Sequence, residues 1–321
     1  MTEKLLEIEN LSVRYTVNKV TVEAVTDLSL GISYGECVGL VGETGAGKTT
    51  TALAIMGLIP DPPGKIVKGH IRFEGEELLS KTQKQMRKIR GNSISMIFQD
   101  PMTSLNPVIR VGDQIMEVLL LHNDISKAEA TVKAQKMLEM VGIPANRYPE
   151  YPHQFSGGMK QRVMIACALA CNPKLLIADE PTTALDVTIQ AQILELIGNL
   201  KKEFNTAMLM ITHDLGVVSE VCDKVAVMYA GNVVEHGTVS AVYDNPAHPY
   251  TRGLFKSLPS LDEDVERLEP IAGMMPDPSN LPPGCRFSSR CPECSDRCTG
   301  EFPKYVEVEP GHVVACIGVR G

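Results

Sequence analysis

The chain has 321 residues and a formal net charge of −8, from 39 acidic and 31 basic side chains. This length predicts two structural units, and a hydrophobic content of 44% is typical of a soluble protein with a large core. The acidic balance argues against a nucleic-acid-binding protein, because such proteins present positive charge to phosphates. The first ten residues lack an apolar signal-peptide core, and no apolar run approaches the roughly 20 residues of a membrane span. We therefore expect a cytosolic protein that reaches a membrane only through partners.

The predicted elements alternate between strands and helices along most of the chain. Alternation of this kind predicts an α/β fold with a parallel sheet. The region 259–284 is rich in proline and acidic residues and is predicted to be a linker or a loosely packed extension. Strands are predicted within 5–41, at 70–78, 93–100, 173–181 and 207–212, and as a pair over 224–237; helices are predicted at 48–59, from about 103 to 165, at 187–203 and at 214–222.

The segment GETGAGKTT follows an apolar strand and opens a predicted helix. It matches G-x-x-x-x-G-K-[ST], in which glycines let the backbone wrap a phosphate and the helix N-terminus favours its negative charge. We expect Lys48 to reach the β- and γ-phosphates and the hydroxyl of Thr49 to ligate Mg²⁺. The whole segment is the predicted ATP-binding loop: Gly42, Glu43, Thr44, Gly45, Ala46, Gly47, Lys48, Thr49 and Thr50.

A second set of polar residues follows the predicted strands of the same sheet. The segment LLIADE places two carboxylates after an apolar run, and ligands of open α/β sheets bind at such strand ends. We expect Asp179 to hold Mg²⁺, usually through water, and Glu180 to polarise the attacking water. We expect Gln99 to contact Mg²⁺ and that water, and His213 to donate a hydrogen bond to the γ-phosphate.

Another glycine-rich turn, within QFSGGMKQR over 154–162, precedes a predicted long helix. Ser156, Gly157 and Gly158 then form a second helix N-terminus that can receive phosphate. One nucleotide needs only the first such terminus. We therefore expect the second to serve a nucleotide bound to another copy.

Taken in order, these motifs resemble the nucleotide-binding subunits of ABC transporters over about residues 5–245. The resemblance implies a P-loop, RecA-like ATPase core with an antiparallel β subdomain and an α-helical subdomain. It implies that two subunits pair head to tail around two ATP molecules, that Tyr15 stacks on adenine, and that Asp186 couples the two sites. The matching set is 42–49, Gln99, 155–159, Asp179-Glu180, Ala184-Leu185-Asp186 and His213.

Three further segments are similar to the oligopeptide, dipeptide and nickel importer branch. These are FSGGMKQRVMIA, in which Met159 stands where the signature L-S-G-G-Q has glutamine, NPAHPYTRGL over 245–254, and the cysteine-rich tail. The branch implies a heterodimer with a related ATPase, two membrane permeases docking near 101–125, and an extracellular binding protein. It places the subunit on the cytoplasmic face of the membrane. We expect uptake of di- or oligopeptides; nickel or another small solute is the alternative, and a non-transport ABC-type ATPase is a further one.

Five of the nine cysteines lie between 285 and 316. In a reducing cytosol, clustered thiols favour a metal over a disulfide. The branch resemblance implies a structural [4Fe–4S] cluster on Cys285, Cys291, Cys298 and Cys316, with Cys294 as an extra thiol. Four thiolates also suit zinc, although these four lack the paired C-x₂-C usual for structural zinc, and unmetallated thiols are a third alternative. The predicted organisation is an ATPase domain over 1–255, with a helical subdomain at about 103–165, and a C-terminal extension over 256–321.

Overall fold

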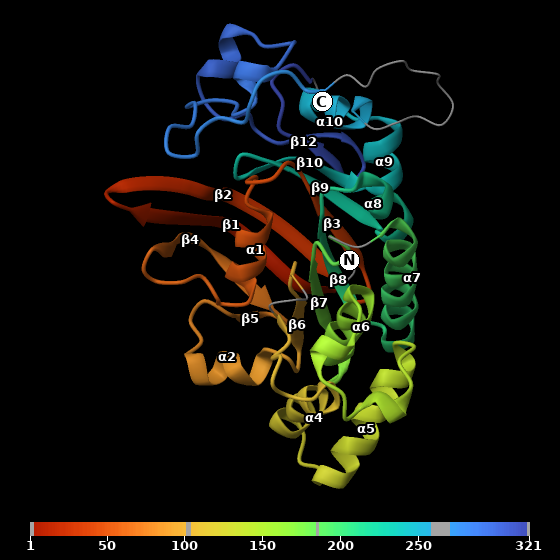
Figure 1. Ribbon diagram of the computed structural model, residues 1–321. Coiled ribbons are helices and arrows are strands. Elements are labelled where there is room, and N and C mark those ends of the chain that lie inside the picture. The colour runs from red at the N-terminus through yellow and green to blue at the C-terminus, as the bar shows by residue number, and fades with distance from the viewer. Residues whose placement is uncertain (1–2, 101–103, 184–185, 258–269, 320–321) are drawn as a thin grey trace. The chain divides into compact units, whose positions relative to one another are not determined.

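The computed structural model describes residues 3–100, 104–183, 186–257 and 270–319 (Figure 1). The chain divides into two compact units, each assembled from segments that are distant in sequence. Unit 1 comprises Met1–Leu6, Ile32–Cys37 and Phe73–Ile211, and unit 2 comprises Glu7–Gly31, Val38–Arg72 and Thr212–Gly321. The predicted phosphate loop therefore belongs to unit 2, and the two predicted carboxylates belong to unit 1.

Unit 1 is built on three parallel strands, β6 (Ile94–Ile97), β7 (Leu175–Asp179) and β8 (Ala207–Thr212). β7 pairs with both neighbours. Every residue of the three strands is buried, as expected for a parallel sheet covered on both faces. Because the strands are parallel, the residues that follow β6 and β7 emerge at the same edge.

Three helices of unit 1 pack against one another: α4 (Val111–His122), α5 (Lys127–Met140) and α6 (Gly157–Leu169) (Figure 1). α5 begins at a capping box formed by Ser126 and Glu129. The short 3₁₀ helices η1 (Ala145–Arg147) and η2 (Pro152–Gln154) connect α5 to α6. These helices lie in the region that the sequence predicts to be helical.

Two more helices belong to the described part of unit 1. α7 (Val187–Phe204) buries Ile193, Leu194, Ile197 and Leu200 on one face, which is the spacing of an amphipathic helix. Its bounds differ by one residue from the predicted 187–203. α2 (Gln83–Ile89) is not among the predicted elements; it is a short, mostly polar helix that buries only Met86, so it lacks the apolar period by which helices are found.

Unit 2 contains a mixed sheet. β3 (Cys37–Val41) pairs in parallel with β9 (Lys224–Tyr229), and β9 pairs antiparallel with β10 (Asn232–Thr238). β12 (His312–Val314) then pairs antiparallel with β10, and β11 (Val306–Glu309) with β12. The tail therefore adds two strands to the sheet that leads into the phosphate loop, and the sequence analysis did not predict them.

A second sheet in unit 2 has the strand order β2-β1-β4, from β1 (Lys4–Val17), β2 (Val20–Ser33) and β4 (Gly64–Phe73). The two-residue β5 (Glu76–Glu77) follows β4 in the chain. Asn18 and Lys19 join β1 to β2 with φ values of +49° and +67°, which is the conformation of a tight hairpin turn. Sequence analysis predicts short strands here, whereas β1 and β2 have 14 residues each.

The helices of unit 2 are short: α1 (Lys48–Ile55), α8 (Leu215–Val221), α9 (Val239–Asp244), α10 (Pro249–Lys256), η3 (Ser288–Arg290) and η4 (Asp296–Thr299). Its core joins β9, α10 and the tail through Tyr229, Tyr250 and Phe287. The rings of Tyr229 and Tyr250 have centroids 4.6 Å apart, and Phe287 lies edge-on to Tyr229 at 5.2 Å. Within the described residues, no helix combines the length and apolar character needed to cross a membrane.

Candidate nucleotide site

The predicted phosphate loop lies between β3 and α1. Gly47 occupies the N-cap of α1 with φ +104°, and a Cβ at this position would lie 2.3 Å from the carbonyl oxygen of Ala24. Gly42 has φ +150°, and its Cβ would meet the carbonyl oxygen of Met228 at 2.1 Å. Both contacts are with backbone, which cannot move aside cheaply, so only glycine fits at these two places. The loop is thus shaped by close packing against neighbouring strands.

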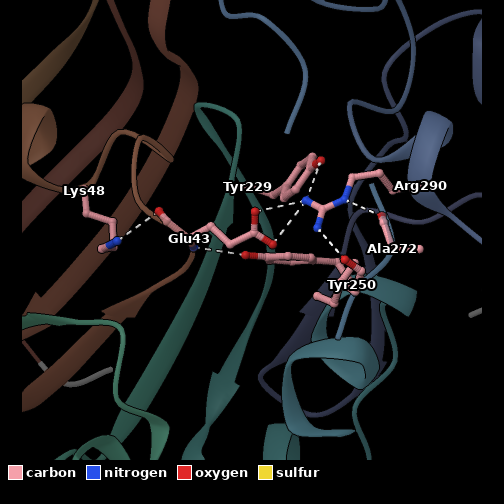
Figure 2. Close-up of polar contacts among 7 residues, drawn as sticks. Glu43, Lys48, Tyr229, Tyr250, Ala272 and Arg290 are labelled. Carbon is pink, nitrogen blue, oxygen red and sulfur yellow. Dashed lines mark hydrogen bonds and ion pairs between the residues drawn. The ribbon is translucent and has the colours of Figure 1, made fainter. Parts of the chain in front are cut away.

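Lys48 folds back over the loop at the start of α1. Its Nζ donates a hydrogen bond to the carbonyl oxygen of Glu43 at 3.1 Å (Figure 2) and another to that of Gly42 at 2.6 Å. The residue is only 6% exposed. The N–H of Gly231, in the β9–β10 turn, donates to the Ala46 carbonyl at 2.9 Å. The ammonium is therefore held inside the loop, where a phosphate would need its charge.

The other residues of the loop differ in exposure. Thr44, Gly45 and Thr49 are exposed, Thr50 is half-buried and Ala46 is buried. Thr49 and Thr50 stand in the first turn of α1, where backbone N–H groups and the helix dipole favour an anion. The exposed side of the loop is thus the side predicted to face a phosphate.

Glu43 directs its carboxylate toward the tail. The Nη1 atom of Arg290 lies 3.1 Å and 3.0 Å from its two carboxylate oxygens, and the Glu43 backbone N–H donates to the hydroxyl of Tyr250 at 3.1 Å (Figure 2). Arg290 also donates to the Tyr229 hydroxyl and to the carbonyls of Ala272 and Ile271. Burial lowers the pKa of the Arg290 guanidinium, but its hydrogen bonds to Glu43 and Tyr229 outweigh this and raise the pKa above its usual value.

Sequence reasoning missed Arg290 and Tyr250 as neighbours of the loop. Tyr250 belongs to NPAHPYTRGL, a segment that indicates the importer branch. Arg290 directly precedes Cys291, a predicted metal ligand. No local pattern indicates either contact, because the paired residues are 207 and 247 positions apart.

In unit 1, the structure brings Gln99 and Glu180 together. The Gln99 side-chain N–H donates to the Glu180 carboxylate at 2.7 Å, and the Thr183 hydroxyl donates to the same oxygen at 2.9 Å. Glu180 has φ +45°, and its backbone N–H donates to the Ile211 carbonyl at 2.8 Å. Asp179 ends β7 and is only 2% exposed. The two carboxylates thus occupy different environments: Asp179 is buried, and Glu180 is half-buried and accepts from the exposed Gln99 and the half-buried Thr183.

Two predicted residues of unit 2 lie at the ends or edges of strands. His213 follows β8 and is exposed, and its neighbour Asp214 caps α8 by accepting from the N–H groups of Gly216 and Val217. Tyr15 lies near the end of β1, half-buried against Gly64. The role predicted for Tyr15 is stacking of its ring face on adenine.

The second glycine-rich turn begins α6, as predicted. Ser156 is the N-cap, and its Oγ accepts from the Met159 N–H at 3.4 Å. Ser156 and Gly157 are exposed, while Gly158 packs against α7, where an added Cβ would lie 2.6 Å from Ile189. The turn therefore presents an open helix N-terminus to the surface of unit 1.

Asp186 occupies the N-cap position of α7 and is exposed. Ala184 and Leu185, which complete its predicted motif, lie outside the described residues, as do residues 101–103 at the start of the predicted permease-docking region.

The four cysteines predicted as ligands line one small cavity in unit 2: Cys285, Cys291, Cys298 and Cys316. The cavity has a volume of about 20 Å³, which is room for about one water molecule. The Cys285 N–H donates to the Cys298 carbonyl at 2.8 Å, and burial raises the pKa of the Cys285 thiol to about 11. Cys294 is exposed and does not line this cavity.

No group of three or more histidine, cysteine, aspartate or glutamate side chains in the described part of the chain is arranged to hold a metal. Four thiols on one cavity match the donor chemistry of an iron–sulfur or zinc site. The arrangement of their side chains in the structure, in contrast, does not form a metal-binding group. The predicted tail site therefore has the right donors but not the ligand geometry.

Comparisons with known proteins agree with the phosphate loop and the fold. Residues 25–183 match the family model for ABC transporter, and residues 234–298 match that for the oligopeptide/dipeptide transporter C-terminal region. The structure also resembles that of the ATP-binding cassette MJ0796, solved as a dimer with ADP and Pi, at 27% identity and a TM-score of 0.66, covering 73% of this chain and 98% of that one. These findings define an ABC-type ATPase, with the cassette fold that the sequence predicts.

Similarity to individual proteins narrows the group of ABC-type ATPases to which the chain belongs. The chain is 53% identical to the oligopeptide transport ATP-binding protein AppD of Bacillus subtilis, over 97% of this chain and 96% of that protein. It is 51% identical to the oligopeptide transport ATP-binding protein OppD of Escherichia coli, over 98% and 93%. It is 49% identical to the dipeptide transport ATP-binding protein DppD of B. subtilis, over 98% and 94%. The chain belongs to the ATP-binding subunits of ABC transporters, in the oligopeptide/dipeptide group.

Proposed function

We propose that this chain is the ATP-hydrolysing subunit of an importer for di- or oligopeptides. The observation that carries the proposal is the near-full-length similarity to oligopeptide and dipeptide transport ATP-binding proteins, in a chain whose phosphate loop is fully formed. The three relatives named above are oligopeptide or dipeptide transport proteins, so they favour peptides over nickel or another small solute, the alternative left by the sequence.

The residues of each unit have distinct roles in this proposal. Lys48 and the first turn of α1 bind the phosphates of ATP. Mg²⁺, held by Thr49 and Gln99 and through water by Asp179, neutralises charge on the phosphates when it is bound. Glu180 polarises the attacking water, and the hydrogen bond from Gln99 orients its carboxylate. His213 donates a hydrogen bond to the γ-phosphate, and Tyr15 stacks on the adenine.

The proposed working form is a head-to-tail dimer with a homologous ATPase subunit. The exposed N-terminus of α6, with Ser156, Gly157 and Gly158, would face the nucleotide of the partner, and Asp186 would couple the two sites. Closure on ATP and opening after hydrolysis would move two permeases that receive solute from an extracellular binding protein. The subunit would lie peripherally on the cytoplasmic face of the membrane and would not bind nucleic acid.

For the tail, we propose a [4Fe–4S] cluster on the four cysteines that line one cavity, with zinc as the alternative metal. The thiols would have to rearrange around the cluster, whose role would be structural. The proposed domains are the ATPase domain 1–255, with the helical subdomain at about 103–165, and the extension 256–321. The pairing of β12 with β10 supports an extension built onto the ATPase sheet.

The function is tested with Glu180→Gln in the complex reconstituted with its permeases. The variant should bind ATP with parental affinity and hydrolyse it at least about a hundredfold more slowly, because an amide cannot polarise water as a base. Glu195→Gln, at an exposed position on α7, is the matched control and should keep parental turnover. Parental hydrolysis by Glu180→Gln would refute its role, and ATPase stimulation by nickel but not by peptide would refute the cargo.

A further inference from the structure

The contact between Arg290 and Glu43 joins the tail to the phosphate loop within unit 2 (Figure 2). We propose that Arg290 is a positioning residue for ATP binding, which holds the phosphate loop through Glu43 and makes the C-terminal extension part of the nucleotide site. The inference rests on the proposed ATP site and adds a residue to it that no loop motif contains.

The guanidinium of Arg290 is built into its position. Its side chain is only 5% exposed, and three of its contacts are with groups outside the loop, the Tyr229 hydroxyl and the Ala272 and Ile271 carbonyls. These contacts fix the guanidinium whether or not Glu43 is present. A charge that is already fixed loses little conformational entropy when it binds its partner, so it can hold a loop effectively.

Glu43 is held by two contacts. Its carboxylate accepts hydrogen bonds from Arg290, and its backbone N–H donates to the hydroxyl of Tyr250, which is fully buried. The carbonyl of the same residue accepts from Lys48. A shift of Glu43 would therefore shift an oxygen that positions the phosphate-binding ammonium.

Arg286 provides a second connection between the same tail segment and the phosphate loop. Its guanidinium donates to the Ala230 carbonyl at 2.9 Å and to the Thr26 hydroxyl at 3.1 Å. The next residue after Ala230, Gly231, donates to the carbonyl of Ala46 in the loop. Two arginines that lie between Cys285 and Cys291 thus contact or support the loop, and this makes accidental proximity of the tail a poor explanation.

The charge on Glu43 predicts the direction in which each substitution changes ATP affinity. An unpaired carboxylate beside the loop would repel the phosphates of ATP, and Arg290 neutralises it at contact distance. Loss of Arg290 alone should therefore harm ATP binding more than loss of both partners. A purely structural contribution of Arg290 would give the reverse, with the double variant at least as impaired as the single one.

The test is a double-mutant cycle on the full chain, with a fluorescent ATP analogue and Mg²⁺ as the probe. Arg290→Gln should weaken binding about tenfold, the change expected from losing one hydrogen-bonded charge pair. Glu43→Gln should weaken it less, and Glu43→Gln with Arg290→Gln should bind more tightly than Arg290→Gln alone. In the reconstituted complex, Arg290→Gln should raise KM for ATP and leave kcat near the parental value.

Arg252→Gln is the matched control, because it breaks an exposed ion pair with Glu293 in the same region of unit 2; its affinity should stay within about twofold of the parent. If Arg290→Gln does not fold, Arg290→Lys, which keeps the charge but not the fork of donors, should give an intermediate loss. Parental affinity in Arg290→Gln, or strictly additive losses in the cycle, would overturn the proposal. Failure of the parent itself to bind ATP would overturn the proposed function instead.

Discussion

A single glycine, Gly47, sets the local backbone of the phosphate loop. Gly47 has a positive φ and a backbone oxygen where a Cβ would stand, whereas Gly75 has φ +77° and nothing within 4 Å of such a Cβ. The two positions separate the cost of a left-handed backbone from the cost of a clash.

We expect Gly47→Ala to abolish ATP binding and to lower the free energy of unfolding by more than about 2 kcal/mol, since it adds a clash to backbone strain. Gly75→Ala should cost only about 1 kcal/mol and leave ATP affinity unchanged, because the added methyl meets open space. Urea unfolding and nucleotide titration of both variants measure these effects. Equal losses in the two variants would show that the packing around Gly47 has no special role.

At this scale the sequence predicted what local motifs encode. The loop, the N-cap Ser156 and the residues after β6 and β7 follow from order and spacing, and Gln99 and Glu180 lie in contact as the shared sheet edge suggests. The direction of the Glu43 side chain could not be predicted. It depends on partners in a segment with no recognisable helix or strand pattern, and on a tertiary contact that a single sequence does not record.

Among the elements, β10 connects the ATPase sheet to the tail. It pairs with β9 and β12, and its residue Glu235 is fully buried. The carboxylate accepts from the N–H groups of Ala247 and His248, and His312 of β12 lies 2.7 Å from it. One side chain thus fastens a strand of the tail and the entry to α10 onto the ATPase sheet.

Replacement of Glu235 should therefore destabilise unit 2. We expect Glu235→Ala to lower the free energy of unfolding by about 3–5 kcal/mol, because it leaves the N–H groups of Ala247 and His248 and the buried imidazole of His312 without this partner. Glu235→Gln keeps one acceptor oxygen and should cost less. Glu301→Ala, at an exposed position in the tail, should change stability by no more than about 0.5 kcal/mol. Chemical denaturation ranks the three, and a neutral Glu235→Ala would contradict the fastening role.

Element prediction succeeded where burial gives a clear pattern. β8 has the predicted bounds of 207–212 and α7 differs by one residue, because each carries a long apolar run or stripe. α1 ends at Ile55, before the predicted 59, since Gly57 interrupts the helix with φ +60°. β11 and β12 escaped prediction because they are three or four residues long and take their conformation from pairing with β10.

For the molecule as a whole, the open question of chemistry is whether the four cysteines that line one cavity of unit 2 bind a metal. The cavity's present volume of about 20 Å³ suits one water, so binding of a cluster would require the four thiols to rearrange around it. The ligand assignment came from family resemblance; residue spacing alone left iron–sulfur, zinc and free thiols open.

Protein purified without oxygen should be brown and contain about four iron atoms and four acid-labile sulfides per chain. Cys316→Ser should lose the visible absorbance and the iron, because it removes one of four ligands. Cys294→Ser is the matched control and should retain both, since that thiol is exposed and lies off the cavity. A colourless anaerobic preparation that contains zinc would exclude the iron–sulfur cluster.

The partnership of Glu43 with Arg290 also has a consequence for biosynthesis. The two residues are separated by 247 positions, and the strand that covers β10 is made later still. While the ribosome is still making the tail, the phosphate loop lacks its contact with Arg290, and the edge of β10 that later pairs with β12 has no partner strand. Non-local contacts of this kind form slowly. The nascent chain should therefore gain nucleotide affinity and protection from aggregation together, only after the tail has left the exit tunnel.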